Sequence, residues 1–398
     1  MEIYSPKLFI EINKSNYIFA IGDENKNKNF YLIYKKIVPI KGIDSARISD
    51  LDLAFSTIRE NILLIEQKIN FTFKEAIIIL DNFHHTFLNI TGFKKLNGSE
   101  ILKENITYIL NSLKSNVDKF ENKKTILHIF NTKYILDKKK IKNLPIGLFG
   151  DFYSHELSFC LIDNNDNKNL HKIFEKCNLN IKKVLLKSFI ESSIISSKHK
   201  ECDTFFKIQI NESESKILYF ENDALKFEQN FNFGSRIVIN DIIKITSLSE
   251  NIIKKFLSNP LLSQQITEQE LIEKEFFENE TYKKIKKKLI LEIAEARIKE
   301  FSELIFLKNI NLTSHKKEKQ IILLNIGEKS NFDVFKEKYT LFFSANNFHN
   351  VKIIENYSIE ENIKNANEIV NFGWKQEAIP VIQSKKSMIA RFFDVLFD

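Results

Sequence analysis

Two stretches of this chain begin in the same way, and the repetition limits the folds open to it. Near the N-terminus, apolar runs at 8–12 and 17–21 flank a polar turn, a pattern typical of two antiparallel strands. Similar runs at 205–210 and 217–220 flank a second polar turn in the C-terminal half. A hairpin followed by further strands and helices suits a mixed sheet with covering helices. The sequence therefore predicts an α/β chain with two related halves.

The segments that follow each hairpin have clear helical or strand periodicity. Apolar residues at helical spacing predict helices at 50–69 and 240–257, and a long, highly charged helix at 264–307. Short, fully apolar runs predict buried strands at 76–80 and 320–326. We therefore expect each half to complete its sheet with at least one buried strand.

Composition excludes several classes of protein. Hydrophobic residues make up 43% and charged residues 28% of the 398, as in soluble globular proteins, and no apolar run approaches the ~20 residues of a membrane span. The start lacks the basic head and apolar stretch of a secretory signal. The net charge of +7 would permit binding to nucleic acid or anionic lipid, but acidic residues are scattered among the basic ones, which favours a solvated lysine surface. Without a helix-turn-helix signature or aromatic–basic interleaving, we expect no nucleic-acid partner.

Cysteine and histidine spacing gives no sign of a metal site. The three cysteines form no CxxC pair, and isolated histidines such as His84, His85 and His155 lack ligand spacing. We therefore expect no metal and no disulfide framework, which fits a reducing cytoplasm.

The C-terminal residues 387–398 form the most informative segment. At about 100° per residue they predict an amphipathic helix with Ser387 as its N-cap. A helix of three turns is marginal in water, so it needs a surface that buries its apolar side. One surface is an anionic membrane, with Arg391 near the headgroups; the alternative is the protein's own core. The residues predicted to meet lipid are Met388, Ile389, Arg391, Phe392, Phe393, Val395, Leu396 and Phe397.

A motif in the first half identifies a family. Residues 127–137 read LHIFNTKYILD and residues 141–150 read IKNLPIGLFG. This stretch resembles a segment of the bacterial cell-division protein FtsA, with one extra residue, Leu144, before the proline. Shorter stretches at 41–50, 169–181, 233–242 and 296–304 are also similar to FtsA, so the resemblance runs nearly end to end. The motif residues that carry it are His128, Tyr134, Asp137, Asn143, Pro145, Gly147 and Gly150.

The resemblance implies an α/β, actin-like two-domain fold with RNase H-like halves, an FtsA-type 1C insertion and a C-terminal amphipathic helix. The implied domain bounds are 1–80, 162–202 and 360–380 for domain 1A, 81–161 for subdomain 1C, 203–239 and 307–359 for domain 2A, 240–306 for subdomain 2B, 381–387 for a linker and 388–398 for the membrane-targeting helix.

The resemblance also implies a function without enzymatic activity. FtsA anchors filaments of FtsZ, which form the Z ring, to the cytoplasmic face of the inner membrane at the division site. It assembles head to tail through 1C and recruits later divisome proteins. The implied partners are thus the FtsZ C-terminal peptide, anionic lipids, other copies of the chain and later division proteins. Arg297 and Glu300 match positions of the 2B helix linked with FtsZ, although an i,i+3 surface ion pair would also explain them.

The nucleotide site of the family is eroded in this sequence. Its first phosphate loop has Asn13 where the family has glycine, and its second reads QINESESK, which puts Glu212 and Glu214 where a triphosphate would lie. Side chains and negative charge there predict weak or absent binding of ATP and Mg²⁺. The alternative function is an active ATPase or kinase of the actin, Hsp70 and sugar-kinase superfamily. The remaining candidate nucleotide-binding residues are Asn13, Lys14, Ser15, Asn211, Gly234, Lys254 and Gly327.

Overall fold

The computed structural model describes residues 5–25, 29–81, 83–199, 201–258, 267–277, 280–316, 319–327 and 335–380. The chain divides into two compact units. Unit 1 takes in Met1–Asp203, Glu221–Lys226 and Tyr357–Asp398, and unit 2 takes in Thr204–Phe220 and Phe227–Asn356.

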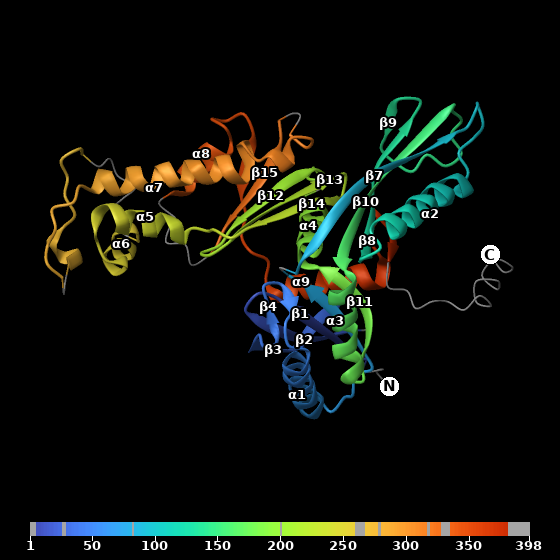
Figure 1. The fold of residues 1–398 in the computed structure, drawn as a ribbon, viewed down its shortest axis with the longest axis horizontal. Coiled ribbons are helices and arrows are strands. Elements are labelled where there is room, and N and C mark those ends of the chain that lie inside the picture. The colour runs from blue at the N-terminus through green and yellow to red at the C-terminus, as the bar shows by residue number, and fades with distance from the viewer. Residues whose placement is uncertain are drawn as a thin grey trace. The chain divides into compact units, whose positions relative to one another are not determined.

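Unit 1 contains a five-stranded sheet whose middle strands are buried along nearly their whole length. The strand order is β11-β6-β1-β2-β3, with β1, β6 and β11 parallel and the β1–β2 and β2–β3 pairs antiparallel (Figure 1). The apolar runs in β1 and β6 are long because both faces of the sheet are covered. The strands are β1 Lys7–Ile12, β2 Asn16–Glu24, β3 Phe30–Pro39, β6 Glu75–Leu80 and β11 Asn180–Leu186.

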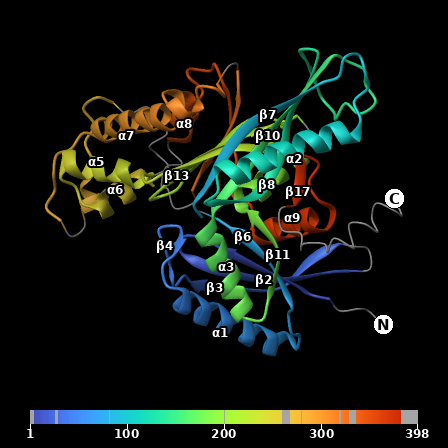
Figure 2. The ribbon, with the colours of Figure 1, turned by 45° about the vertical axis from the view of Figure 1, so that its right-hand side comes forward.

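Helices cover this sheet in two packed pairs. Helix α1 packs against α3, as Figure 2 shows, and α4 packs against α9. Local sequence sets their ends: Asp50 accepts a hydrogen bond from Leu53 N at the start of α1, and Asn70 ends it in the left-handed conformation that asparagine tolerates. The helices are α1 Leu51–Ile69, α3 Asn164–Lys176, α4 Lys187–Lys198 and α9 Ile359–Phe372, and a small hairpin pairs β4 Ile43–Asp44 with β5 Arg47–Ile48.

A second sheet of unit 1 is built from the segment between β6 and α3, closed by a strand from near the C-terminus. Its order is β17-β8-β10-β7, and β9 pairs with β8. Helix α2 lies along one face (Figure 2). Gly92 of β7 allows the close approach of Ile109 and Leu113. The elements are β7 His85–Lys95, α2 Lys103–Phe120, β8 Lys124–Leu136, β9 Lys139–Ile141, β10 Phe152–Asp163 and β17 Glu377–Pro380.

Unit 2 contains a sheet with the same strand order as the first sheet of unit 1. The order is β14-β13-β12-β15-β16, with β12 antiparallel to β13 and parallel to β15, which is parallel to β16 (Figure 1). A core of aromatic and aliphatic side chains joins this sheet to its helices. The elements are β12 Phe205–Ile210, β13 Ser215–Glu221, β14 Ala224–Phe231, α5 Arg236–Thr246, α6 Glu250–Leu257, α7 Lys287–Ser302, β15 Ile321–Ile326, α8 Lys336–Phe343 and β16 Asn350–Ile353.

The duplicated topology confirms the prediction of two related halves, and the fold is actin-like. The prediction of one long helix over 264–307 was wrong. The described part of that segment has a 3₁₀ turn at Lys274–Phe277, an isolated bridge between Leu271 and Lys286, and a helix only from Lys287, which runs into a π-helical turn at Glu303–Leu307. The helix expected over 240–257 is two helices, α5 and α6, because Ser247 ends the first in a left-handed conformation and Ser249 caps the second.

Candidate functional site

The family motif of the first half lies on β8, where its histidine holds the C-terminal strand β17. His128 Nδ1 lies 2.8 Å from Glu377 Oε1, and Lys183 Nζ lies 2.7 Å from Glu377 Oε2. All three side chains are buried. Burial alone would raise the pKa of Glu377, but the hydrogen bond from His128 and the charge of Lys183 lower it. Burial lowers the pKa of His128, so its imidazole is neutral at pH 7.

The other motif residues shape the turn that joins β8 to β10. Asp137 Oδ1 accepts hydrogen bonds from the backbone amides of Asp151 and Phe152, at 2.9 and 2.8 Å. A side chain at Gly150 would lie 2.4 Å from a methyl of Leu136, so glycine here lets Leu136 pack closely against the turn. His128, Asp137 and Gly150 of the motif thus have structural roles in the second sheet.

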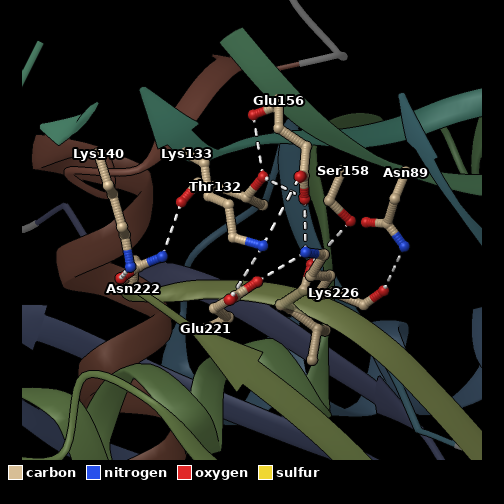
Figure 3. Close-up of polar contacts among 10 residues, drawn as sticks. Asn89, Thr132, Lys133, Lys140, Glu156, Ser158, Glu221, Asn222 and Lys226 are labelled. Carbon is tan, nitrogen blue, oxygen red and sulfur yellow. Dashed lines mark hydrogen bonds and ion pairs between the residues drawn. The ribbon is translucent and has the colours of Figure 1, made fainter. Parts of the chain in front are cut away.

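Residues 221–226, the turn between β13 and β14, are fixed to β8 and β10 by a network of charged and polar groups (Figure 3). Lys226 Nζ lies 2.5 Å from Glu156 Oε1 and 2.6 Å from Glu221 Oε2, and Lys133 Nζ lies 3.2 Å from Glu221 Oε1. Burial alone would lower the pKa of Lys226, but its hydrogen bonds to the two carboxylates raise it. Asn222 adds a hydrogen bond of 2.8 Å to the Thr132 carbonyl. Sequence analysis missed this network, because its members lie on separate strands.

The candidate nucleotide residues of unit 1 lie in the β1–β2 turn. Asn13 Oδ1 accepts hydrogen bonds from the amides of Ser15 and Asn16, at 3.0 and 2.8 Å, and Asn13 N donates to the Asn16 carbonyl at 3.1 Å. Lys14 is exposed at the tip. The Asn13 side chain thus accepts hydrogen bonds from two amides that a glycine loop would leave free to bind a phosphate.

In unit 2 three of the candidates meet at one end of the sheet. The Asn211 carbonyl accepts a hydrogen bond of 2.9 Å from Ser235 N, directly after Gly234, and Gly327 N donates to the Ile210 carbonyl at 2.9 Å. A side chain at Gly234 would lie 2.2 Å from the Asn211 carbonyl oxygen, so its glycine serves close packing of the backbone.

Lys254, the remaining candidate, belongs to an exposed series of ion pairs. Its Nζ lies 2.6 Å from Glu250, and Arg236 lies 3.7 Å from Glu250 and 3.5 Å from Glu212. We call Glu212, Arg236, Glu250 and Lys254 the unit 2 ion-pair chain. Each cation in this chain already has a carboxylate partner.

The contacts of the candidate residues differ from those that a triphosphate needs. A triphosphate needs open backbone amides and uncompensated positive charge. In unit 1 the amides of Ser15 and Asn16 are taken by Asn13, and in unit 2 the cations are paired with Glu212 and Glu250. The described residues also contain no cluster of three or more histidine, cysteine or acidic side chains that could hold a metal ion.

Arg297 and Glu300 lie together on α7. The Arg297 guanidinium contacts both Glu300 and Asp241, the latter from α5 at 2.5 Å. Glu300 is about half exposed, and Asp241 is less so. The structure therefore brings the two residues into one ion-pair cluster at the surface of unit 2.

The predicted membrane-binding residues Met388, Ile389 and 391–397 lie outside the described part of the chain. Within the described residues, no helix is both long and apolar enough to cross a bilayer.

Sequence comparison finds relatives at low identity, and no family model matches the chain. The cell division protein FtsA of Buchnera aphidicola subsp. Schizaphis graminum is 26% identical over 300 residues, which cover 74% of this chain and 71% of that protein. The cell division protein FtsA of Escherichia coli K12 is 20% identical over 235 residues, 58% of this chain and 55% of that protein. The matched stretch thus spans between about half and 71% of these relatives.

Comparison of structures agrees at the level of fold. A chain of the PilM–PilN type IV pilus biogenesis complex superposes with a TM-score of 0.50 and 9% identity, covering 92% of this chain and 95% of that one. At such identity the likeness concerns the fold alone.

Proposed function

We propose that this chain, which is similar in sequence to FtsA and has an actin-like fold, is a non-enzymatic adaptor that anchors FtsZ filaments to the cytoplasmic face of the bacterial inner membrane. The observation that carries the proposal is its sequence similarity to FtsA over 74% of its length. As such an adaptor it would assemble with other copies of itself at the division site and recruit later division proteins. The subdomain bounds given above would then correspond to 1A, 1C, 2A and 2B.

The surface of α7 supports a contact with the FtsZ C-terminal peptide. Arg297 carries a planar guanidinium that can hold a carboxylate with two hydrogen bonds. Its partner Glu300 has a side chain 48% exposed, compared with 18% for Asp241. A carboxylate of the peptide would displace Glu300, the partner that water already reaches, and leave Asp241 in place to orient the arginine.

The C-terminal sequence supports attachment to lipid. A single amphipathic helix of this length binds weakly, and assembly into a polymer would add many weak contacts into a stable attachment. Membrane binding would then depend on assembly along FtsZ filaments.

The test is flotation of the full-length chain with vesicles that contain anionic phosphatidylglycerol, compared with a chain that ends at Ser384. We expect the full-length chain to float and the shortened one to remain in the pellet fraction, and we expect high salt to weaken flotation only in part. Equal flotation of the two chains would contradict the anchoring proposal.

The FtsZ contact is tested by titrating a fluorescent FtsZ C-terminal peptide into the full-length chain and into Arg297→Ala. We expect the substitution to weaken binding by roughly tenfold or more, because it removes a charge-assisted contact. Arg236→Ala is the matched control, since it also removes an arginine from a surface ion pair of unit 2. Equal weakening by both variants would point to general charge attraction and would contradict a site on α7.

A further inference from the structure

One edge of the first sheet in unit 1 gathers charged groups from three parallel strands. Strands β1, β6 and β11 run in the same direction, so their carboxyl ends meet at one edge. In open α/β sheets this edge is where ligands bind.

Three side chains meet at this edge, and we call them the strand-end cluster: Glu11 near the end of β1, Asp81 directly after β6, and Lys187 at the first position of α4, directly after β11. Lys187 Nζ lies 2.8 Å from Glu11 Oε1 and 3.1 Å from Asp81 Oδ2. The Glu11 side chain is 1% exposed, while those of Lys187 and Asp81 are 22% and 24% exposed. A buried carboxylate of this kind needs a positive partner.

The cluster places an ammonium group between two carboxylates, the kind of ligand that also binds hard divalent cations. Mg²⁺ and Mn²⁺ are bound by one or two protein carboxylates, with water and phosphate oxygens completing the shell. We propose that Lys187 is a built-in substitute for a divalent cation: its ammonium fills the position between Glu11 and Asp81, so the cluster takes neither free Mg²⁺ nor Mg²⁺ bound to a nucleotide.

The charge balance of the cluster separates this role from that of an anion receptor. The carboxylates of Glu11, Asp81 and Glu191 outnumber the one ammonium of Lys187, which disfavours the binding of phosphate. Burial alone would lower the pKa of Lys187, but Asp81, Glu11 and Glu191 together raise it well above its ordinary value. The ammonium of Lys187 is therefore stabilised in its charged form by the carboxylates around it.

The experiment measures Mn²⁺ binding by the electron paramagnetic resonance signal of the free ion, with the full chain and three variants. The wild-type chain is expected to bind no Mn²⁺ below about 1 mM at this cluster, and Lys187→Met is expected to gain affinity by roughly tenfold or more, since it uncovers two carboxylates. Lys187→Arg keeps the positive charge, and Glu11→Gln/Lys187→Met loses one of the two ligands. Both should remain like wild type.

A Lys187→Met variant that binds no more Mn²⁺ than wild type would overturn the proposal, and so would equal gains in all three variants. Because this variant is expected to lose stability, its thermal unfolding is also followed with and without Mn²⁺, which should raise its midpoint and leave the wild-type midpoint unchanged.

Calorimetry of the wild-type chain with Mg²⁺ and ATP gives a test that needs no variant. We expect no Mg²⁺-dependent binding of nucleotide at submillimolar concentration, and such binding would refute the substitution of the ion by lysine. The inference is independent of the anchoring proposal, because vesicle flotation and cation binding are measured separately.

Discussion

The two five-stranded sheets with the same strand order differ in how they satisfy the charges at one end. In unit 1 the strand-end cluster encloses a carboxylate that is 1% exposed, and one lysine compensates it. In unit 2 the ion-pair chain consists of side chains that are between about one third and one half exposed. Removing an ion from the interior leaves its partner unsolvated, whereas water replaces a lost partner at the surface. We therefore expect the protein to depend on the charges of the strand-end cluster more than on those of the unit 2 ion-pair chain.

Lys187→Met should have the largest effect on stability. It leaves the buried Glu11 carboxylate without its cation, so we expect the free energy of unfolding to fall by about 3 kcal/mol. This value is at the lower end for a buried ion pair because Lys187 is partly exposed. Urea denaturation followed by circular dichroism measures it. The double variant Glu11→Gln/Lys187→Met should lose less than the single one. A larger loss in the double variant would show that the pair does not act as a unit.

Glu377→Gln should have the second-largest effect on stability. We expect it to lower the free energy of unfolding by about 2 kcal/mol, because it weakens the charged hydrogen bonds to Lys183 and His128. The loss should be local to β17. Hydrogen exchange monitored by mass spectrometry should show faster exchange at 376–380 than in wild type, with β12 of unit 2 unchanged. Unchanged exchange at β17 would mean that backbone pairing with β8 alone holds the strand.

Acidification should destabilise the chain through His155, which lies on β10 and is fully buried. Among the described residues neither of its ring nitrogens has a hydrogen-bond partner, and burial lowers its pKa from 6.5 to about 4. The unfolded chain therefore takes up this proton below pH 6.5 while the folded chain does not until about pH 4. Stability from this group is complete above pH 6.5 and is lost as the pH falls, by about 2 kcal/mol from pH 7 to pH 5.

The variant His155→Phe checks this assignment. Its free energy of unfolding, measured by urea titration at several pH values, should fall less steeply between pH 6.5 and pH 4 than that of wild type. His349→Phe in unit 2 is the matched control, since His349 is only partly buried and its slope should change less. Equal slopes in wild type and His155→Phe would place the proton uptake elsewhere.

Arg236→Ala in the unit 2 ion-pair chain should have the smallest effect. Its side chain is 53% exposed, so water replaces both glutamate partners, and the thermal midpoint should shift by less than about 2 °C. Calorimetric scanning at low and high salt measures the shift. A large loss of stability would remove the contrast between the two sheets.

Sequence analysis predicted the duplicated hairpins and the FtsA-like motif because both are local patterns of apolar, polar and turn residues. It could not predict what His128 does, because its partner Glu377 lies 249 positions away in the chain. The ion pairs of Lys187 could not be predicted for the same reason, because Glu11 and Asp81 come close to it only through the parallel pairing of β1, β6 and β11. The wrong prediction of one helix over 264–307 has a different cause. There the local pattern itself misled, because the charged helical periodicity did not reveal the break before Lys287.

The position of β17 has a mechanical consequence. Its residues pair antiparallel with β8, from Glu377 opposite Phe130 to Pro380 opposite His128. If the chain beyond Pro380 is tethered as proposed, any tension on that tether first loads this short edge strand. The contacts of Glu377 with His128 and Lys183 would then hold β17 against β8, and the force would pass through β8 into the rest of the second sheet. The strength of these contacts would set the force at which β17 separates from β8.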